Sequence, residues 1–173
     1  SSDVCSSDLK LTPKLSDSAK ILYVMYFGMT IAEVLLLLLG GMSFFDAVIH
    51  TFGSVGTGGF SNYNSSAAHF DSLYINLVLC LFMSMAGINF TLYYYLFRGD
   101  WKKFFKDMEL RVYFIILGAA TLVCAGSLYF HKAYDTVGDS LEQALFQSVT
   151  IMTTTGFATA DTNLWPTTCK IVL

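Results

Sequence analysis

The stretch Thr57-Gly58-Gly59-Phe60-Ser61 returns, with matched size and polarity, as Thr154-Thr155-Gly156-Phe157-Ala158 after an offset of 97 residues. The same register extends toward the N-terminus, where residues 47–51 (Ala-Val-Ile-His-Thr) align with residues 144–148 (Ala-Leu-Phe-Gln-Ser). Self-similarity at a fixed offset indicates a repeated structural unit. We therefore expect two copies of one unit, each built around a Thr-x-Gly-Phe turn.

Each turn follows a short apolar segment that we expect to be helical. These segments are Phe44–Phe52 and Leu141–Ile151. Both are about ten residues long, whereas crossing a bilayer takes about 20 helical residues. Irregular backbone at membrane depth is tolerated where it is buried in protein or lines a water-filled cavity. The pattern therefore predicts two re-entrant pore loops.

Three longer apolar segments, Lys20–Gly41, Leu73–Phe97 and Val112–Phe130, have lengths typical of membrane spans. The composition agrees, with 54% hydrophobic residues, 13% charged residues and a mean hydropathy of +0.56. The sequence predicts an all-α membrane protein embedded in a lipid bilayer. Its repeated unit is a helix, a re-entrant pore loop and a second helix, as in a potassium-channel-like pore.

The basic residues indicate an orientation. Eight of the ten Lys and Arg residues precede the first span or lie between the second and third. Such regions face the cytoplasm in membrane proteins, so the two pore loops belong on the opposite side. The eight residues are Lys10, Lys14, Lys20, Arg98, Lys102, Lys103, Lys106 and Arg111.

These features divide the chain into four parts. Residues 10–97 form one complete repeat, residues 98–111 form a cytoplasmic linker, and residues 112–173 form a partial second repeat of helix, pore loop and the start of another helix. Residues 1–9 are polar and nearly repeat themselves. We expect them to be foreign or disordered and exclude them from the fold.

Several functional classes are excluded by the residues present. The net charge is −3 and no basic stripe interleaved with aromatic residues occurs, so no nucleic-acid partner is expected. The four cysteines and three histidines are dispersed without metal-ligand spacing. Paired acids, or a nucleophile beside its base at one membrane depth, are not visible. We expect no enzyme activity and no organic cofactor.

The two turns have the residue types of a potassium selectivity filter. In potassium channels, backbone carbonyls of Thr-Val-Gly-Tyr-Gly loops replace the hydration shell of the ion. Glycine reaches the backbone angles that direct successive carbonyls to one side of the strand. We predict that potassium, as the transported ion, is bound by the filter carbonyls of Thr57, Gly58, Gly59, Phe60, Thr154, Thr155, Gly156 and Phe157.

Beyond the two turns, further motifs carry a resemblance to a known family. They include Gly41-Met42-Ser43-Phe44-Phe45-Asp46-Ala47, Gly87-Ile88-Asn89-Phe90, Glu109-Leu110-Arg111 and Thr159-Ala160-Asp161. With these motifs the chain resembles the Trk/Ktr/HKT superfamily, most closely its bacterial TrkH-type membrane subunits. The resemblance covers the chain from about Lys10 to its end.

The resemblance implies transmembrane potassium uptake through a pore formed by four such repeats in one chain. This segment then corresponds to the second repeat and the start of the third, with the remaining two repeats elsewhere in the parent chain. It also implies a multi-pass protein of the bacterial inner membrane, a homodimer, and a cytoplasmic nucleotide-binding regulatory ring as partner.

Two alternatives stay open. One is a non-conducting homologue that keeps the pore fold, and the other is a sodium-permeable cation transporter. In the family that this chain resembles, serine at the filter glycine position accompanies sodium permeability in some units, whereas positions 59 and 156 here are both glycine. Glu33, an acid inside the first span, is either part of an ion relay or is paired within the helix bundle.

Overall fold

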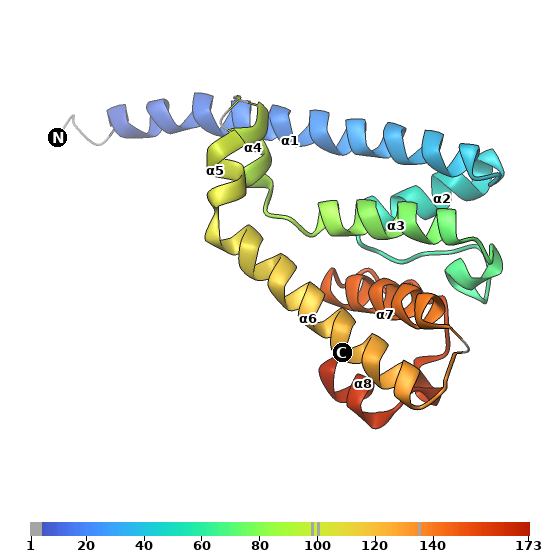
Figure 1. Ribbon diagram of the computed structural model, residues 1–173. Helices are drawn as coiled ribbons and strands as arrows, with labels where there is room; N and C mark the ends of the chain where they lie inside the picture. Colours follow the sequence, from blue (N-terminus) through green and yellow to red (C-terminus); the bar gives the residue numbers. More distant parts are fainter. Residues whose placement is uncertain (1–4, 98, 100, 135) are drawn as a thin grey trace.

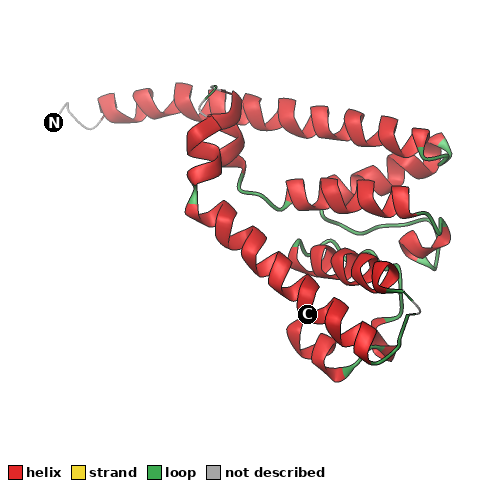
Figure 2. Ribbon diagram, in the orientation of Figure 1, coloured by secondary structure: helices red, strands yellow, loops and turns green. Residues whose placement is uncertain are grey.

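All regular structure in the described residues is helical (Figures 1 and 2). The computed structural model describes residues 5–97, 99, 101–134 and 136–173. In chain order the elements are α1 (Cys5–Leu39), α2 (Phe44–Val55), the 3₁₀ turn η1 (Ser66–His69), α3 (Leu73–Ala86), α4 (Phe90–Phe97), α5 (Trp101–Lys106), α6 (Met108–Phe130), α7 (Val137–Met152), the 3₁₀ turn η2 (Thr162–Leu164) and α8 (Thr167–Val172).

The helices form two similar groups. In each group a long helix, α1 or α6, is followed by a shorter helix, α2 or α7, that runs back alongside it (Figure 1). An irregular segment then returns toward the end where the shorter helix began, and α3 or α8 follows. The predicted order of helix, re-entrant loop and helix is therefore the observed order.

The groups meet where α3 packs against α7 (Figure 1). Leu79 and Met83 of α3 and Phe146 of α7 are fully buried and belong to one hydrophobic core with Leu37 of α1. A partly buried polar contact crosses the same interface, because the Asn76 side-chain amide donates to a Glu142 carboxylate oxygen at 2.8 Å. The core thus joins the two repeats as well as stabilising the first.

Among the described residues, two helices are long and apolar enough to cross a membrane. They are Ala19–Leu39 within α1, and α6. Their positions correspond to the first and third predicted spans. The helix α3, with 14 residues, is shorter than a full span by itself.

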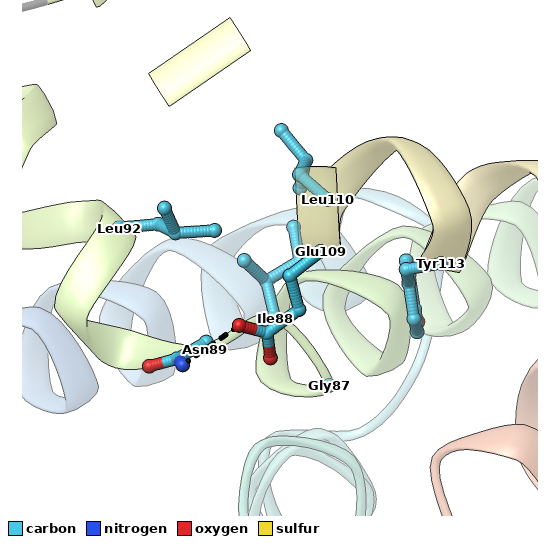
Figure 3. A pocket seen from close by; sticks show the side chains of 7 residues that line it. All are labelled: Gly87, Ile88, Asn89, Leu92, Glu109, Leu110 and Tyr113. Carbon is cyan, nitrogen blue, oxygen red and sulfur yellow. Dashed lines mark hydrogen bonds between the residues drawn. The ribbon is translucent and has the colours of Figure 1, made fainter. Parts of the chain in front are cut away.

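The second predicted span, Leu73–Phe97, is wrong as a single helix, because the chain breaks between α3 and α4 at residues 87–89. A Cβ atom on Gly87 would lie 2.9 Å from Thr153 Cγ2 and 3.0 Å from Tyr113 Oη, so close packing requires glycine there. The Asn89 side chain then donates to Glu109 at 3.1 Å, beside a cavity of about 40 Å³ (Figure 3). The hydropathy pattern does not indicate this break, because the contacts at Gly87 come from residues distant in the sequence.

The predicted linker, residues 98–111, includes helical residues. It contains α5, and α6 begins within it at Met108. The Asp107 carboxylate caps α6 by accepting hydrogen bonds from the N–H groups of Glu109 and Leu110 at 2.8 and 3.3 Å. The cap explains why α6 starts before the apolar run that predicted it.

Two further boundaries differ from the prediction. Residues 5–9 belong to α1, so the expectation of disorder is wrong for them, while residues 1–4 lie outside the described residues and a foreign origin stays a prediction. The short helices are longer than expected. The helix α2 begins at Phe44 as predicted and continues to Val55, whereas α7 begins earlier than predicted, after the N-cap Thr136, and ends at Met152.

Two leucines on α1 test the position of the core. Leu37 is 0% exposed and Leu35 is 56% exposed, although they are two residues apart. Leu37→Ala leaves a cavity, so we expect the free energy of unfolding to fall by about 2–5 kcal/mol. Leu35→Ala should change it by about 0.5 kcal/mol or less. Unfolding of the purified protein in one detergent measures both, and equal losses would contradict this assignment of the core.

Candidate functional site

The two predicted filter loops have the same backbone conformation. Thr57 and Gly59 adopt φ angles of +49° and +62°, and their equivalents Thr154 and Gly156 adopt +57° and +90°. Left-handed angles cost a residue with a side chain about 1–2 kcal/mol, so threonine keeps them where other contacts enforce them. The 97-residue offset found in the sequence therefore holds for the backbone as well.

In the first loop, three successive N–H groups point back to the last turns of α2. The N–H of Thr57 donates to the Ser54 carbonyl at 3.1 Å. The N–H groups of Gly58 and Gly59 both donate to the Gly53 carbonyl, at 2.8 and 3.0 Å. These contacts satisfy the donors of the loop and several carbonyls that a helix end leaves without partners.

The second loop repeats this pattern at the end of α7. The N–H of Thr154 donates to the Ile151 carbonyl at 3.0 Å, and those of Thr155 and Gly156 donate to the Thr150 carbonyl at 2.9 and 3.3 Å. The Gly156 N–H is also 3.1 Å from the Thr150 hydroxyl oxygen. Every backbone donor and acceptor in this set is equivalent, at the 97-residue offset, to one in the first loop, whereas the Thr150 hydroxyl has no counterpart at Gly53.

Unlike the N–H groups of the two loops, their backbone carbonyls accept no hydrogen bond from the described residues. Among the described residues, none donates a hydrogen bond to the backbone carbonyls of residues 57–59 or 154–156. Both loops also follow directly on the C-terminal ends of α2 and α7, where the helix dipole is negative. Free carbonyl oxygens at the negative end of a helix are suited to binding a cation.

The structure brings the two loops together. A Cβ atom on Gly59 would overlap the carbonyl oxygen of Thr155, so the two backbones are in direct contact. Just beyond the loops, the Ala68 N–H donates to the Ala158 carbonyl at 3.1 Å, and the Ala158 N–H donates to the Ser66 hydroxyl at 3.2 Å. The sequence predicted both loops but did not predict these contacts between them.

The two filter phenylalanines differ in their environments. Phe157 is 1% exposed and stacks on His50 of α2, with ring centroids 5.6 Å apart and ring planes inclined by 17°. A Cβ atom on Gly53 would lie 2.6 Å from the Phe157 ring, so the contact extends to the backbone of α2. Phe60, its equivalent, is 77% exposed. Phe157 thus connects the second loop to the helix of the first repeat.

A side-chain brace that the sequence analysis missed holds the segment after the first loop. Asp46, near the start of α2, accepts hydrogen bonds from Asn62 Nδ2 at 2.6 Å, from the Tyr63 hydroxyl at 3.1 Å and from the Ser43 hydroxyl at 2.8 Å. Burial would raise the pKa of Asp46, but these hydrogen bonds and the nearby His50 hold it below its ordinary value.

The brace has an equivalent in the second repeat. There the Thr159 hydroxyl donates to the Gln143 side-chain oxygen at 2.6 Å, again at the 97-residue offset from Asn62 and Asp46. The spacing Ser43-x-x-Asp46, typical of a capping box, was the available signal for the first brace. Each loop is therefore held from both sides, by amide hydrogen bonds before it and by a side-chain bond after it.

Comparison with known proteins gives consistent relatives. The family model described as "TrkH: Cation transport protein" matches residues 6–173. The Trk system potassium uptake protein TrkH of Vibrio parahaemolyticus is 38% identical over 169 residues, which are 96% of this chain and 35% of that protein. The protein of the same name from Escherichia coli K12 is 34% identical over 167 residues, again 96% and 35%.

A solved structure agrees with the sequence relatives. The crystal structure of the potassium transporter TrkH from Vibrio parahaemolyticus superposes with a TM-score of 0.87 at 37% identity, covering 92% of this chain and 35% of that one. The chain spans about a third of the length of the curated relatives it matches. With a family model matched from residue 6 to residue 173, this all-α membrane protein belongs to the TrkH family of cation transport proteins.

Proposed function

We propose that this chain forms part of a potassium uptake pore, with the filter carbonyls of residues 57–60 and 154–157 as ligands of the dehydrated ion. The observation that carries this proposal is the hydrogen bonding of the two loops. Their N–H groups are tied to the preceding helices, and none of the described residues donates to the carbonyls of residues 57–59 and 154–156. A loop held by its donors keeps its acceptors in place for a cation that has lost its water.

Potassium is the proposed ion for two reasons. Relatives over nearly the whole chain are named as potassium uptake proteins. The loops themselves keep Thr-x-Gly-Phe, which corresponds to the first four residue types of a potassium filter. Relatives named for uptake also favour transport rather than catalysis, so we propose no enzyme activity and no organic cofactor.

Two loops do not encircle an ion, so we propose two further repeats in the parent protein. The exposed Phe60 supports this proposal. Its equivalent, Phe157, is buried against the α2 helix of the neighbouring repeat. By the same arrangement, Phe60 would pack on the short helix of a repeat that lies outside this chain.

The resemblance to the family supports the remaining proposals. They are a homodimer of the membrane subunit, a cytoplasmic nucleotide-binding regulatory ring as partner, and a multi-pass position in the bacterial inner membrane. The two membrane-length helices and the basic residues in the N-terminal half of α1 and between α4 and α6 support that position. A non-conducting or sodium-permeable homologue is the alternative that the following experiment tests.

Serine substitutions at the two filter glycines test the carbonyl filter. Both glycines have positive φ, but a Cβ on Gly59 would overlap Thr155, whereas a Cβ on Gly156 meets nothing within 4 Å. We therefore expect Gly59→Ser to reduce potassium uptake and relax its selectivity over sodium more than Gly156→Ser does. Uptake by a transport-deficient bacterium expressing the complete gene, with and without added sodium, is the measurement.

Gly28→Ser is the matched control for this pair, because a Cβ at Gly28 on α1 also meets nothing within 4 Å and its φ is not positive. We expect it to leave uptake unchanged. If the transport-deficient cells take up no potassium when they express the unsubstituted gene, the non-conducting alternative replaces our proposal. If sodium enters as readily as potassium in the wild type, the sodium-permeable alternative does.

Alanine substitution of Phe60 tests the proposed additional repeat. If another repeat covers this ring, Phe60→Ala in the complete protein should lower the free energy of unfolding by about 3 kcal/mol, as expected for Phe157→Ala. Phe130→Ala, at a ring that is 84% exposed, is the control and should have little effect. Thermal unfolding in detergent measures all three, and a Phe60→Ala result equal to that of the control would argue against the additional repeat.

A further inference from the structure

Glu33 has a fully buried side chain within a membrane-length helix. It is 0% exposed and lies on α1 within the apolar segment Ala19–Leu39. A carboxyl group at this depth is unfavourable unless it has a specific partner. The residues that bury it belong to this chain, and additional repeats can only cover it further. The burial of Glu33 is therefore a property of the first repeat itself.

The partner of Glu33 is Ser54, in the last turn of α2. The Ser54 hydroxyl donates to Glu33 Oε1, while Glu33 Oε2 has no hydrogen-bond partner among the described residues. The same hydroxyl lies 3.1 Å from the carbonyl oxygen of Thr51, one turn earlier in α2. A hydroxyl has one proton, so Glu33 and the Thr51 carbonyl compete for it.

Ser54 is directly connected to the first filter loop. Its backbone carbonyl accepts the hydrogen bond from the Thr57 N–H at 3.1 Å. Thr57 is the residue at which the loop enters the left-handed conformation, with φ of +49°. A serine hydroxyl that bonds to the carbonyl of the preceding turn can bend a helix. Glu33 therefore influences the helix turn whose carbonyl holds Thr57.

The second repeat has no equivalent of this pair. At the 97-residue offset Ser54 becomes Ile151, whose carbonyl still accepts the Thr154 N–H but whose side chain offers no hydrogen bond. The charged residues of α6 are Glu109, which accepts a hydrogen bond from Asn89, and Arg111, which donates to the Phe105 carbonyl. The polar support is thus a specific feature of the first loop rather than a requirement of the fold.

We propose that Glu33 is a positioning residue for ion selectivity, which sets the conformation of the first filter loop through its hydrogen bond with Ser54. The inference rests on the proposed function, because ion selectivity is its readout. It assigns no ion contact to Glu33, and it requires a hydrogen-bond acceptor at position 33 rather than a negative charge.

The experiment compares five variants in the complete protein, purified and reconstituted into lipid vesicles. They are Glu33→Leu, Glu33→Gln, Ser54→Ala, the double variant Glu33→Leu with Ser54→Ala, and Thr30→Val. Thr30 is the matched control, since it lies one turn before Glu33 and its hydroxyl donates within α1 to the Tyr26 carbonyl at 2.7 Å. The readout is the ratio of rubidium flux to sodium flux, with thermal stability recorded in parallel.

We expect Glu33→Leu and Ser54→Ala each to lower the flux ratio by about threefold to tenfold, as the loss of one hydrogen bond allows. Glu33→Gln should stay near the wild-type ratio, because its side-chain oxygen still accepts from Ser54. The double variant should be no worse than the single variants, because all three lack the same hydrogen bond. Thr30→Val should match the wild type.

Several outcomes would overturn the proposal. One is a normal flux ratio in Ser54→Ala, which decides the matter even if Glu33→Leu fails to fold. Another is a Glu33→Gln ratio as low as that of Glu33→Leu, because the charge would then be the essential property. If the wild type carries no rubidium, the proposed function fails together with this inference. If Gly59→Ser changes selectivity and these variants do not, this inference alone fails.

Discussion

The arrangement of both filter loops depends on one constraint, the pairing of their backbone N–H groups. A short helix that ends inside a membrane leaves carbonyls without partners, and water is not available there to satisfy them. The three N–H groups that follow each short helix meet this need by donating to Gly53 and Ser54, or to Thr150 and Ile151. Turning back in this way requires left-handed residues, which explains the positive φ angles and the glycines. Once these donors are used, the loop carbonyls have no donor among the described residues, which leaves them free for the ion that we propose.

The rest of the fold holds the two short helices so that this pairing can occur. N-caps at Ser43 and Thr136 fix where α2 and α7 begin, and α3 packs against α7 to join the repeats. Beyond each loop, a side-chain bond ties the chain to its short helix, between Asn62 and Asp46 in the first turn of α2, or between Thr159 and Gln143 near the middle of α7. Each loop is then fixed at both ends while its middle contacts the other loop.

The sequence predicted those features that depend on local pattern. The 97-residue repeat located both loops and both short helices, and hydropathy located α1 and α6. Features that depend on packing between distant segments were not predicted. The second span breaks at Gly87, where Thr153 and Tyr113 leave no room for a side chain, and no residue near it in the sequence indicates that contact. The burial of Phe157 and the exposure of Phe60 could not be distinguished either, since both stand in the same motif.

The two loops have equivalent backbone hydrogen bonds but differ in the side chains packed behind them, and this difference bears on function. The second loop forms the equivalent N–H bonds with Ile151 in place of Ser54, so the Glu33–Ser54 pair is an addition to the shared backbone hydrogen bonds of the first loop. A buried acid that the fold does not require is an unfavourable residue to keep in a membrane helix. Glu33 contacts Ser54, and the Ser54 carbonyl accepts the hydrogen bond of Thr57. A small change in the position of Ser54 would therefore move the carbonyls of the first loop. Because the side chains behind the two loops differ, a substitution can change the geometry of one loop and leave the other unchanged. In a symmetric pore of identical repeats, every substitution changes all loops at once.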